Sequence, residues 1–173
     1  KKILSELIDH RSLTKETAHE VLVNLATGKF NLSQTAAFMT VYMMRSITVE
    51  ELQGFRDAML ELCLPAHFDQ PVMDVCGTGG DGKNTINLST LSTFVVAAAG
   101  QPVAKHGNYG VSSACGSSNL LEYFGYKFTN NIDELKRSLD RSNICFMHAP
   151  LFHPAMKNVA PIRKELGVKT FFN

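Results

Sequence analysis

The chain has 173 residues, of which 45% are hydrophobic and 19% are charged, and its formal net charge at pH 7 is +1. This is the composition of a folded globular protein of one or two domains, and it excludes a disordered chain. A net charge so near zero gives no reason to expect nucleic acid or a membrane surface as a partner, so any anion site needs a local group of donors.

Sequence signals of location favour the cytoplasm. The four cysteines stand far apart without a CxxC pair, which suits reduced thiols and gives no zinc motif. The longest apolar run, 94–99, is too short to cross a bilayer. The first residues, KKILSELIDHR, contain acids and lack the apolar core of a signal peptide.

The first part of the chain is predicted to be a small helical domain over residues 1–66. Apolar residues recur at helical spacing from Leu4 onward, and Gly28 and Pro65 are typical of helix ends. Thr48 and Glu51 have the spacing of a capping box. The three helices after the first are expected to begin at Thr14, Ser33 and Thr48.

From Pro71 onward, strands, loops and helices alternate. Strands are expected at 72–76, 102–106 and 144–149. Helices are expected near Ser89, at 118–125, after Asn131, and as one or two segments within 153–167 that are interrupted near Pro161. This order predicts a mostly parallel-sheet α/β domain over 71–173, with ligands at the carboxyl ends of its strands. The apolar ending VKTFFN is typical of a beginning strand, so we expect the chain to be the N-terminal part of a longer protein.

A glycine-rich stretch, GTGGDGKN, follows the first expected strand. A dinucleotide site would need an acid about 20 residues further on for the ribose, yet no Asp or Glu occurs between Asp81 and Glu122. A P-loop would need Ser or Thr after Lys83, where the chain has Asn84. Neither nucleotide motif therefore fits well.

A second polar loop, KHGNYGVSSACGSSN at 105–119, changes the interpretation. Lys83, Lys105 and His106 are the only basic residues in this stretch without acids, and a helix is expected to begin close to Asn87. Glycines let backbone N–H groups approach a ligand, and helix N-termini favour anions. Tight turns alone would explain one such loop, but two in tandem indicate a site for a polyphosphate held by a metal ion and backbone amides.

Four motifs occur in an order that resembles one family over essentially the whole chain: GTGGDGKNTINLST, KHGNYGVSS, GSSNLLEYFG and HPAMKNVAPIRKELGVKTFFN. They resemble anthranilate phosphoribosyltransferases. The resemblance implies a nucleoside phosphorylase-like phosphoribosyltransferase fold and a tryptophan-biosynthesis reaction. That reaction joins anthranilate to phosphoribosyl pyrophosphate (PRPP) and releases pyrophosphate. It also implies Mg²⁺ as cofactor and a homodimer packed through the helical domain.

The resemblance also assigns site residues. It places anthranilate beside Gly77, Asn108 and Arg163, whose guanidinium can pair bidentately with a carboxylate. It assigns Ser89 to the metal and leaves no residue as general acid or base, because the aromatic amine is already neutral at pH 7. The residues assigned to PRPP are Gly80, Asp81, Thr85, Asn87, Ser89, Thr90, Lys105, His106, Gly107, Asn108, Ser112, Ser113 and Ser117.

Two positions depart from the family's motifs. Tyr109 stands where the family usually has arginine, and Asn119 stands where it usually has aspartate. The family's acidic metal-binding pair would lie beyond residue 173. Loss of a cation predicts modestly weaker PRPP binding unless another group replaces it. Two alternatives therefore stay open: a related phosphoribosyltransferase or nucleoside phosphorylase with another acceptor, and a non-catalytic homologue that binds PRPP.

Overall fold

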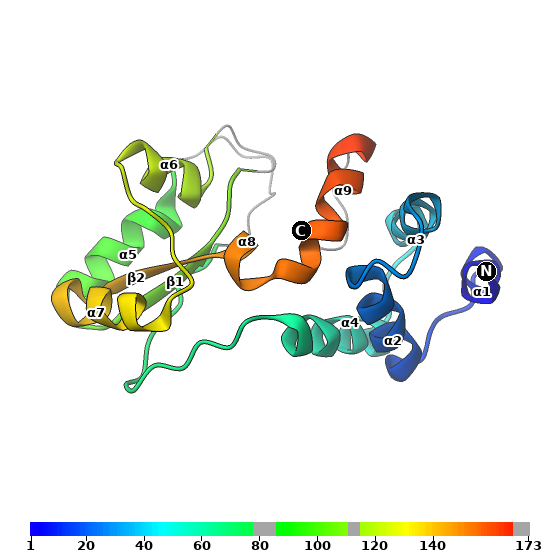
Figure 1. Ribbon diagram of the computed structural model, residues 1–173, viewed down its shortest axis with the longest axis horizontal. Helices are drawn as coiled ribbons and strands as arrows, with labels where there is room; N and C mark the ends of the chain where they lie inside the picture. The colour runs from blue at the N-terminus through cyan, green and yellow to red at the C-terminus, as the bar shows by residue number, and fades with distance from the viewer. Residues whose placement is uncertain (78–85, 111–114, 168–173) are drawn as a thin grey trace. The chain divides into compact units, whose positions relative to one another are not determined.

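The computed structural model describes residues 1–77, 86–110 and 115–167, which fall into two compact units (Figure 1). One unit contains Lys1–Leu64 together with the chain from His153 onward, and the other is Pro65–Phe152. Expectations for 78–85, 111–114 and 168–173, including the strand at VKTFFN, lie outside the described residues.

Local capping signals set the helices of the first unit. Thr14 caps α2 by accepting a hydrogen bond from the backbone N–H of Thr17, and Thr48 and Glu51 form the predicted capping box of α4. Helix α3 begins ahead of the predicted Ser33 because Asn31 is its cap. The elements are α1 (Lys2–Ile8), α2 (Lys15–Ala26), α3 (Leu32–Met44), α4 (Val49–Leu62), the 3₁₀ helix η1 (Pro154–Asn158) and α9 (Ala160–Leu166).

The segment from His153 packs with these helices. Val159 and Ile162 are buried in the same apolar core as α2, α3 and α4. The side-chain amide of Asn158 donates to the carbonyl of Ala26 at 2.7 Å, which satisfies a free carbonyl at the end of α2. From sequence, this segment is expected in the α/β domain over 71–173, and the domain limits in the sequence stay a prediction.

The second unit contains a parallel pair of strands with helices around it. Strand β1 pairs with β2 from Val103–Ile144 to Gly107–His148, which confirms the strands expected at 102–106 and 144–149 and the parallel α/β fold (Figure 1). The elements are α5 (Leu88–Ala98), β1 (Val103–Gly107), α6 (Ser117–Tyr123), α7 (Ile132–Ser142), β2 (Ile144–His148) and α8 (Ala149–Phe152).

The strand expected at 72–76 is only a single bridge between Met73 and Val103. Met73 donates to the carbonyl of Pro102 and accepts from the N–H of Ala104, each within 3.0 Å. The next N–H on the same edge of β1 is that of His106, and it donates to the side chain of Asp74 at 3.2 Å. A carboxylate therefore stands where a backbone carbonyl would have continued the ladder.

The two faces of the strand pair bury different sets of residues. Val103, Ile144 and Phe146 pack with α5 and α6, whereas Ala104 and Cys145 pack with α7 and α8. Because side chains alternate along a strand, Lys105 lies on the α5 side and His106 on the other. No helix in the described part of the chain is long and apolar enough to cross a membrane.

Candidate active site

The N-terminus of α5 forms one side of the site. Asn87 caps the helix, and its side-chain oxygen accepts from the N–H of Thr90 at 3.2 Å and from the hydroxyl of Ser89 at 3.3 Å. Thr90 is fully buried, and its hydroxyl oxygen has no hydrogen-bond partner within the described ranges. The N-terminus of an 11-residue helix carries partial positive charge and favours a bound anion.

Lys105 brings a buried cation to the same place. Its side chain is 2% exposed, and Nζ donates to the hydroxyl of Ser89 at 3.3 Å and to the carbonyl of Val75 at 3.4 Å. Burial lowers the pKa of Lys105, and nearby Cys76 and Asp74 offset this in part. No salt bridge to Lys105 occurs among the residues that the structure describes. A buried cation beside a helix N-terminus, with no carboxylate in salt-bridge contact within the described ranges, suits an anionic ligand.

Two glycines allow close approach at this end of the sheet. A Cβ on Gly107 would lie 2.2 Å from the hydroxyl oxygen of Ser117, so a larger residue there would require that hydroxyl to move. A Cβ on Gly77 would touch Ser89 at 3.4 Å. The carbonyl of Asn108 accepts from the hydroxyl of Ser117 at 3.3 Å. The second loop is therefore tied to the start of α6.

The structure brings the described parts of both predicted loops together. Ser89, at the start of α5 after the first loop, contacts Lys105 at the start of the second loop, and Gly107 packs against Ser117. Gly80, Asp81, Thr85, Ser112 and Ser113 lie outside the described residues. Ligand contact by any of these residues stays a prediction.

His106 and Arg163 have other surroundings. His106 lies on the opposite face of β1 from Lys105, and burial lowers the pKa of its half-buried imidazole. Arg163 lies on α9 in the helical unit, where burial lowers the pKa of its guanidinium. Their predicted roles toward PRPP and anthranilate stay predictions.

Three residues of this region were missed by the sequence analysis: Asp74, Glu122 and His148. Asp74 binds the N–H of His106, so the stretch that is free of acids in sequence has an acid beside it in space. Its position directly before the glycine-rich loop was the available signal. Glu122 accepts from the hydroxyl of Tyr109 at 2.6 Å, and His148 Nδ1 lies 2.8 Å from the hydroxyl oxygen of Ser118. Nothing in the local pattern indicated these two contacts, because they join separate elements.

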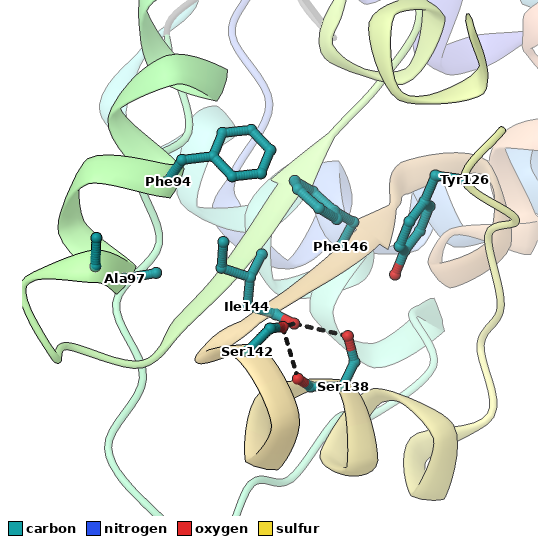
Figure 2. A pocket seen from close by; sticks show the side chains of 8 residues that line it. Phe94, Ala97, Tyr126, Ser138, Ser142, Ile144 and Phe146 are labelled. Atoms are coloured by element: carbon teal, nitrogen blue, oxygen red, sulfur yellow. Dashed lines mark hydrogen bonds between the residues drawn. The ribbon is translucent and has the colours of Figure 1, made fainter. Parts of the chain in front are cut away.

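An open apolar cavity of about 380 Å³ lies elsewhere in the same unit (Figure 2). Two serines, Ser138 and Ser142, lie in its lining, and their hydroxyls both donate to the carbonyl of Ile144. No charged side chain lines it, so it does not suit a phosphate. The residues that line it are Phe94, Ala97, Ala98, Tyr126, Ser138, Ser142, Ile144 and Phe146.

The fold defines a class of protein: a helical bundle together with a parallel-sheet α/β unit. Residues 1–63 match the helical bundle domain of a glycosyl transferase family, and residues 69–173 match the a/b domain of that family. The chain belongs to this glycosyl transferase family.

Several named relatives and solved structures are similar to the chain. Anthranilate phosphoribosyltransferases of Cytophaga hutchinsonii and Bacteroides fragilis are 60% and 53% identical to it, over 100% of the chain and 53% of each relative. The crystal structure of that enzyme from Thermus thermophilus has a TM-score of 0.84 at 38% identity, covering 98% of this chain and 52% of that one. The Saccharomyces cerevisiae enzyme in complex with PRPP and Mg has a TM-score of 0.86 at 26% identity, covering 98% and 51%. The chain thus spans about half the length of the curated relatives it matches.

Proposed function

We propose that the protein, at its full natural length, transfers the phosphoribosyl group of PRPP to the amine of anthranilate in tryptophan biosynthesis. The products are N-(5-phosphoribosyl)anthranilate and pyrophosphate. The observation that carries the proposal is the 3.3 Å contact between Lys105 Nζ and Ser89 Oγ, which joins the start of the second predicted loop to the helix that follows the first. Relatives that are about 60% identical over the entire chain are named anthranilate phosphoribosyltransferase.

The reaction requires stabilisation of a departing anion. The bond between ribose C1 and the pyrophosphate oxygen breaks, and its electron pair leaves with pyrophosphate. The lone pair of the anthranilate nitrogen forms the new bond to C1, and that nitrogen then loses a proton. In this proposal Lys105 and the N-terminus of α5 stabilise the developing negative charge, an interaction that strengthens as the bond breaks; their contact through Ser89 supports this role.

Magnesium is the proposed cofactor, and the donors near Ser89 fit it. Ser89 Oγ and Asn87 Oδ1 are hard oxygen donors 3.3 Å apart, and Mg²⁺ takes such ligands together with waters and substrate phosphates. Within the described residues no cluster of three His, Cys, Asp or Glu side chains occurs. The ligands proposed from the described residues are the oxygens near Ser89 together with the phosphates of PRPP, and these do not require such a cluster. When bound, the ion supplies charge neutralisation to pyrophosphate.

The anthranilate site is proposed at Gly77, Asn108 and Arg163. Gly77 lies against Ser89 and Asn108 against Ser117, so both adjoin the proposed PRPP site. A planar guanidinium is the natural partner for the carboxylate of the acceptor.

The test is an assay with alternative substrate pairs. Anthranilate fluorescence is followed with PRPP and Mg²⁺, and the product is identified by mass spectrometry. We expect consumption of anthranilate only when PRPP is present. Turnover of a nucleobase with ribose 1-phosphate instead would favour a nucleoside phosphorylase, and PRPP binding without turnover would favour the non-catalytic alternative.

We also propose a cytoplasmic homodimer that packs through the helical unit. Large apolar side chains are exposed on that unit, and the buried Cys145 and half-buried Cys63 form no disulfide within the described residues. Sedimentation that shows only monomers at micromolar concentration would contradict the dimer. The exposed apolar residues of the helical unit are Ile8, Leu32, Met43, Met44, Val49, Leu52, Leu60 and Leu64.

A further inference from the structure

Tyr109 connects the loop after β1 to helix α6. Its hydroxyl donates to Glu122 Oε1 at 2.6 Å, a short bond as expected for a carboxylate acceptor. This hydrogen bond raises the pKa of Tyr109, so the phenol remains a protonated donor at neutral pH. The contact crosses from the loop to the second turn of the helix.

The ring of Tyr109 is held separately from its hydroxyl. It lies edge-on to the ring of His148, with centroids 4.9 Å apart and planes at 80°. His148 is itself fixed, because it stacks on Phe128 at 4.4 Å and bonds the hydroxyl of Ser118 at 2.8 Å. Edge-to-face contacts of this kind add to burial and define an orientation.

Asn108 is hydrogen-bonded both to Tyr109 and to the start of α6. The N–H of Tyr109 donates to Oδ1 of Asn108 at 2.8 Å. The carbonyl of Asn108 accepts from the hydroxyl of Ser117 and from the N–H of Ser118, at 3.3 and 3.1 Å. Movement of the Tyr109 backbone would therefore disturb Asn108 and, through the carbonyl of Asn108, its contact with Ser117; both residues are proposed to contact the ligand.

Asn119 provides a second anchor for the same loop. Its Oδ1 accepts from the N–H of Gly110 at 2.9 Å and from the N–H of Gly116 at 3.0 Å. One oxygen thus ties the residue after Tyr109 to the start of α6. An asparagine can make both bonds, since only an acceptor is needed.

We propose that Tyr109 is a positioning residue that holds Asn108 and Ser117 for the phosphoribosyl ligand without touching it. This inference rests on the proposed function. The hydroxyl of Tyr109 is directed to Glu122 and its ring to His148, so its contacts serve the loop rather than the ligand.

The first test compares Tyr109→Phe with Tyr123→Phe in the protein of full natural length. Tyr123 is an exposed tyrosine on the same helix as Glu122, and it serves as the control for loss of a hydroxyl. We expect Tyr109→Phe to raise the PRPP KM about fivefold and, because Asn108 is also proposed in the anthranilate site, to raise the anthranilate KM by a smaller factor, with kcat within twofold of the parent. Equal KM values for the two variants, or a fall in kcat alone, would overturn the proposal.

Two further experiments test the contact between Tyr109 and Glu122: a substitution that can replace it and a double-mutant cycle. Tyr109→Arg can pair with Glu122 and should restore the PRPP KM to within about twofold of the parent. Glu122→Ala should match Tyr109→Phe, and the double variant should lose no more than either, because one contact is removed. A roughly 25-fold loss in the double variant would show independent roles. A hundredfold gain for Tyr109→Arg would place residue 109 on the ligand.

Hydrogen exchange separates this inference from the proposed function. We expect the amides of Asn108–Gly110 and Ser117–Ser118 to exchange about fivefold faster in Tyr109→Phe, with α2 unchanged. If the parent protein does not turn over PRPP and anthranilate, the proposed function fails, whereas the exchange result still decides whether Tyr109 fixes the loop. Unchanged exchange at these amides would overturn the inference.

Discussion

Lys105 is the residue on which the site's electrostatics depend most. Burial of an ammonium group without a paired carboxylate is unfavourable, and the lowered pKa of Lys105 reflects that cost. An anion bound between Lys105 and the N-terminus of α5 would offset it. The burial of Lys105 is thus easier to understand in a protein that binds phosphate than in one that does not.

The role of Arg163 can be tested by a single substitution. Arg163→Ala should raise the anthranilate KM by about tenfold or more and change the PRPP KM by less than about twofold, because a guanidinium–carboxylate pair is lost. Initial rates at varied concentrations of each substrate measure both constants. Lys164→Ala, which removes an exposed cation from the same helix, is the control. Equal changes in the two constants for Arg163→Ala would remove Arg163 from the anthranilate site.

At the scale of elements, Glu51 ties the start of α4 to its neighbours. The capping box was predicted, but the buried carboxylate also accepts from the N–H of Leu13 at 2.9 Å and the hydroxyl of Tyr42 at 2.8 Å, and it pairs with Arg45. Burial alone would raise the pKa of Glu51, yet its hydrogen bonds with Arg45, backbone N–H groups and Tyr42 lower it to about 2. One side chain therefore links α4 to the chain before α2 and to the end of α3.

This network predicts a pH-dependent stability. Because the folded pKa of Glu51 is below its ordinary value of 4.5, its contribution is complete above about pH 4.5 and is lost as pH falls toward 2. Glu51→Gln should lower the free energy of unfolding at pH 7 by about 3 kcal/mol, since Arg45 loses its partner. The variant should also show a flatter decline in acid. Urea unfolding at several pH values measures both effects.

The control for that prediction is Glu50→Gln, an exposed neighbour on the same helix. It should change the free energy of unfolding by less than about 0.5 kcal/mol at pH 7. If Glu51→Gln were as stable as Glu50→Gln, the buried network would not stabilise the helical unit.

Most helices and two of the three expected strands could be predicted from sequence, because their signals are local. Caps such as Thr14 and Asn131 lie next to the turns that they satisfy. The strand expected at 72–76 is shorter than predicted. Its apolar residues are typical of a strand, but its pairing with β1 stops where the side chain of Asp74 accepts the N–H of His106. A sequence pattern does not reveal such a substitution of carboxylate for carbonyl.

At the scale of the whole molecule, the sequence indicates which residue types form the candidate site, but it does not indicate which of those residues contact one another. Glycine-rich loops, a lysine and a helix cap are groups that phosphate sites commonly use, and Lys105 and Asn87 can be recognised as such from sequence. The meeting of Lys105 with Ser89, and the bond of Tyr109 to Glu122, depend on the packing of β1 against α5 and α6. These pairs lie 16 and 13 residues apart, beyond the reach of any local rule.

The central claim is that Lys105 and the start of α5 form one phosphate site that serves the transfer reaction. The most direct measurement is the PRPP KM of Lys105→Met, from anthranilate fluorescence with Mg²⁺ in the protein of full natural length. We predict a rise of about 30-fold or more, with the anthranilate KM within threefold of the parent. Lys127→Met, which removes an exposed lysine of the same unit, should leave both constants unchanged. An unaltered PRPP KM in a folded Lys105→Met protein would contradict the account.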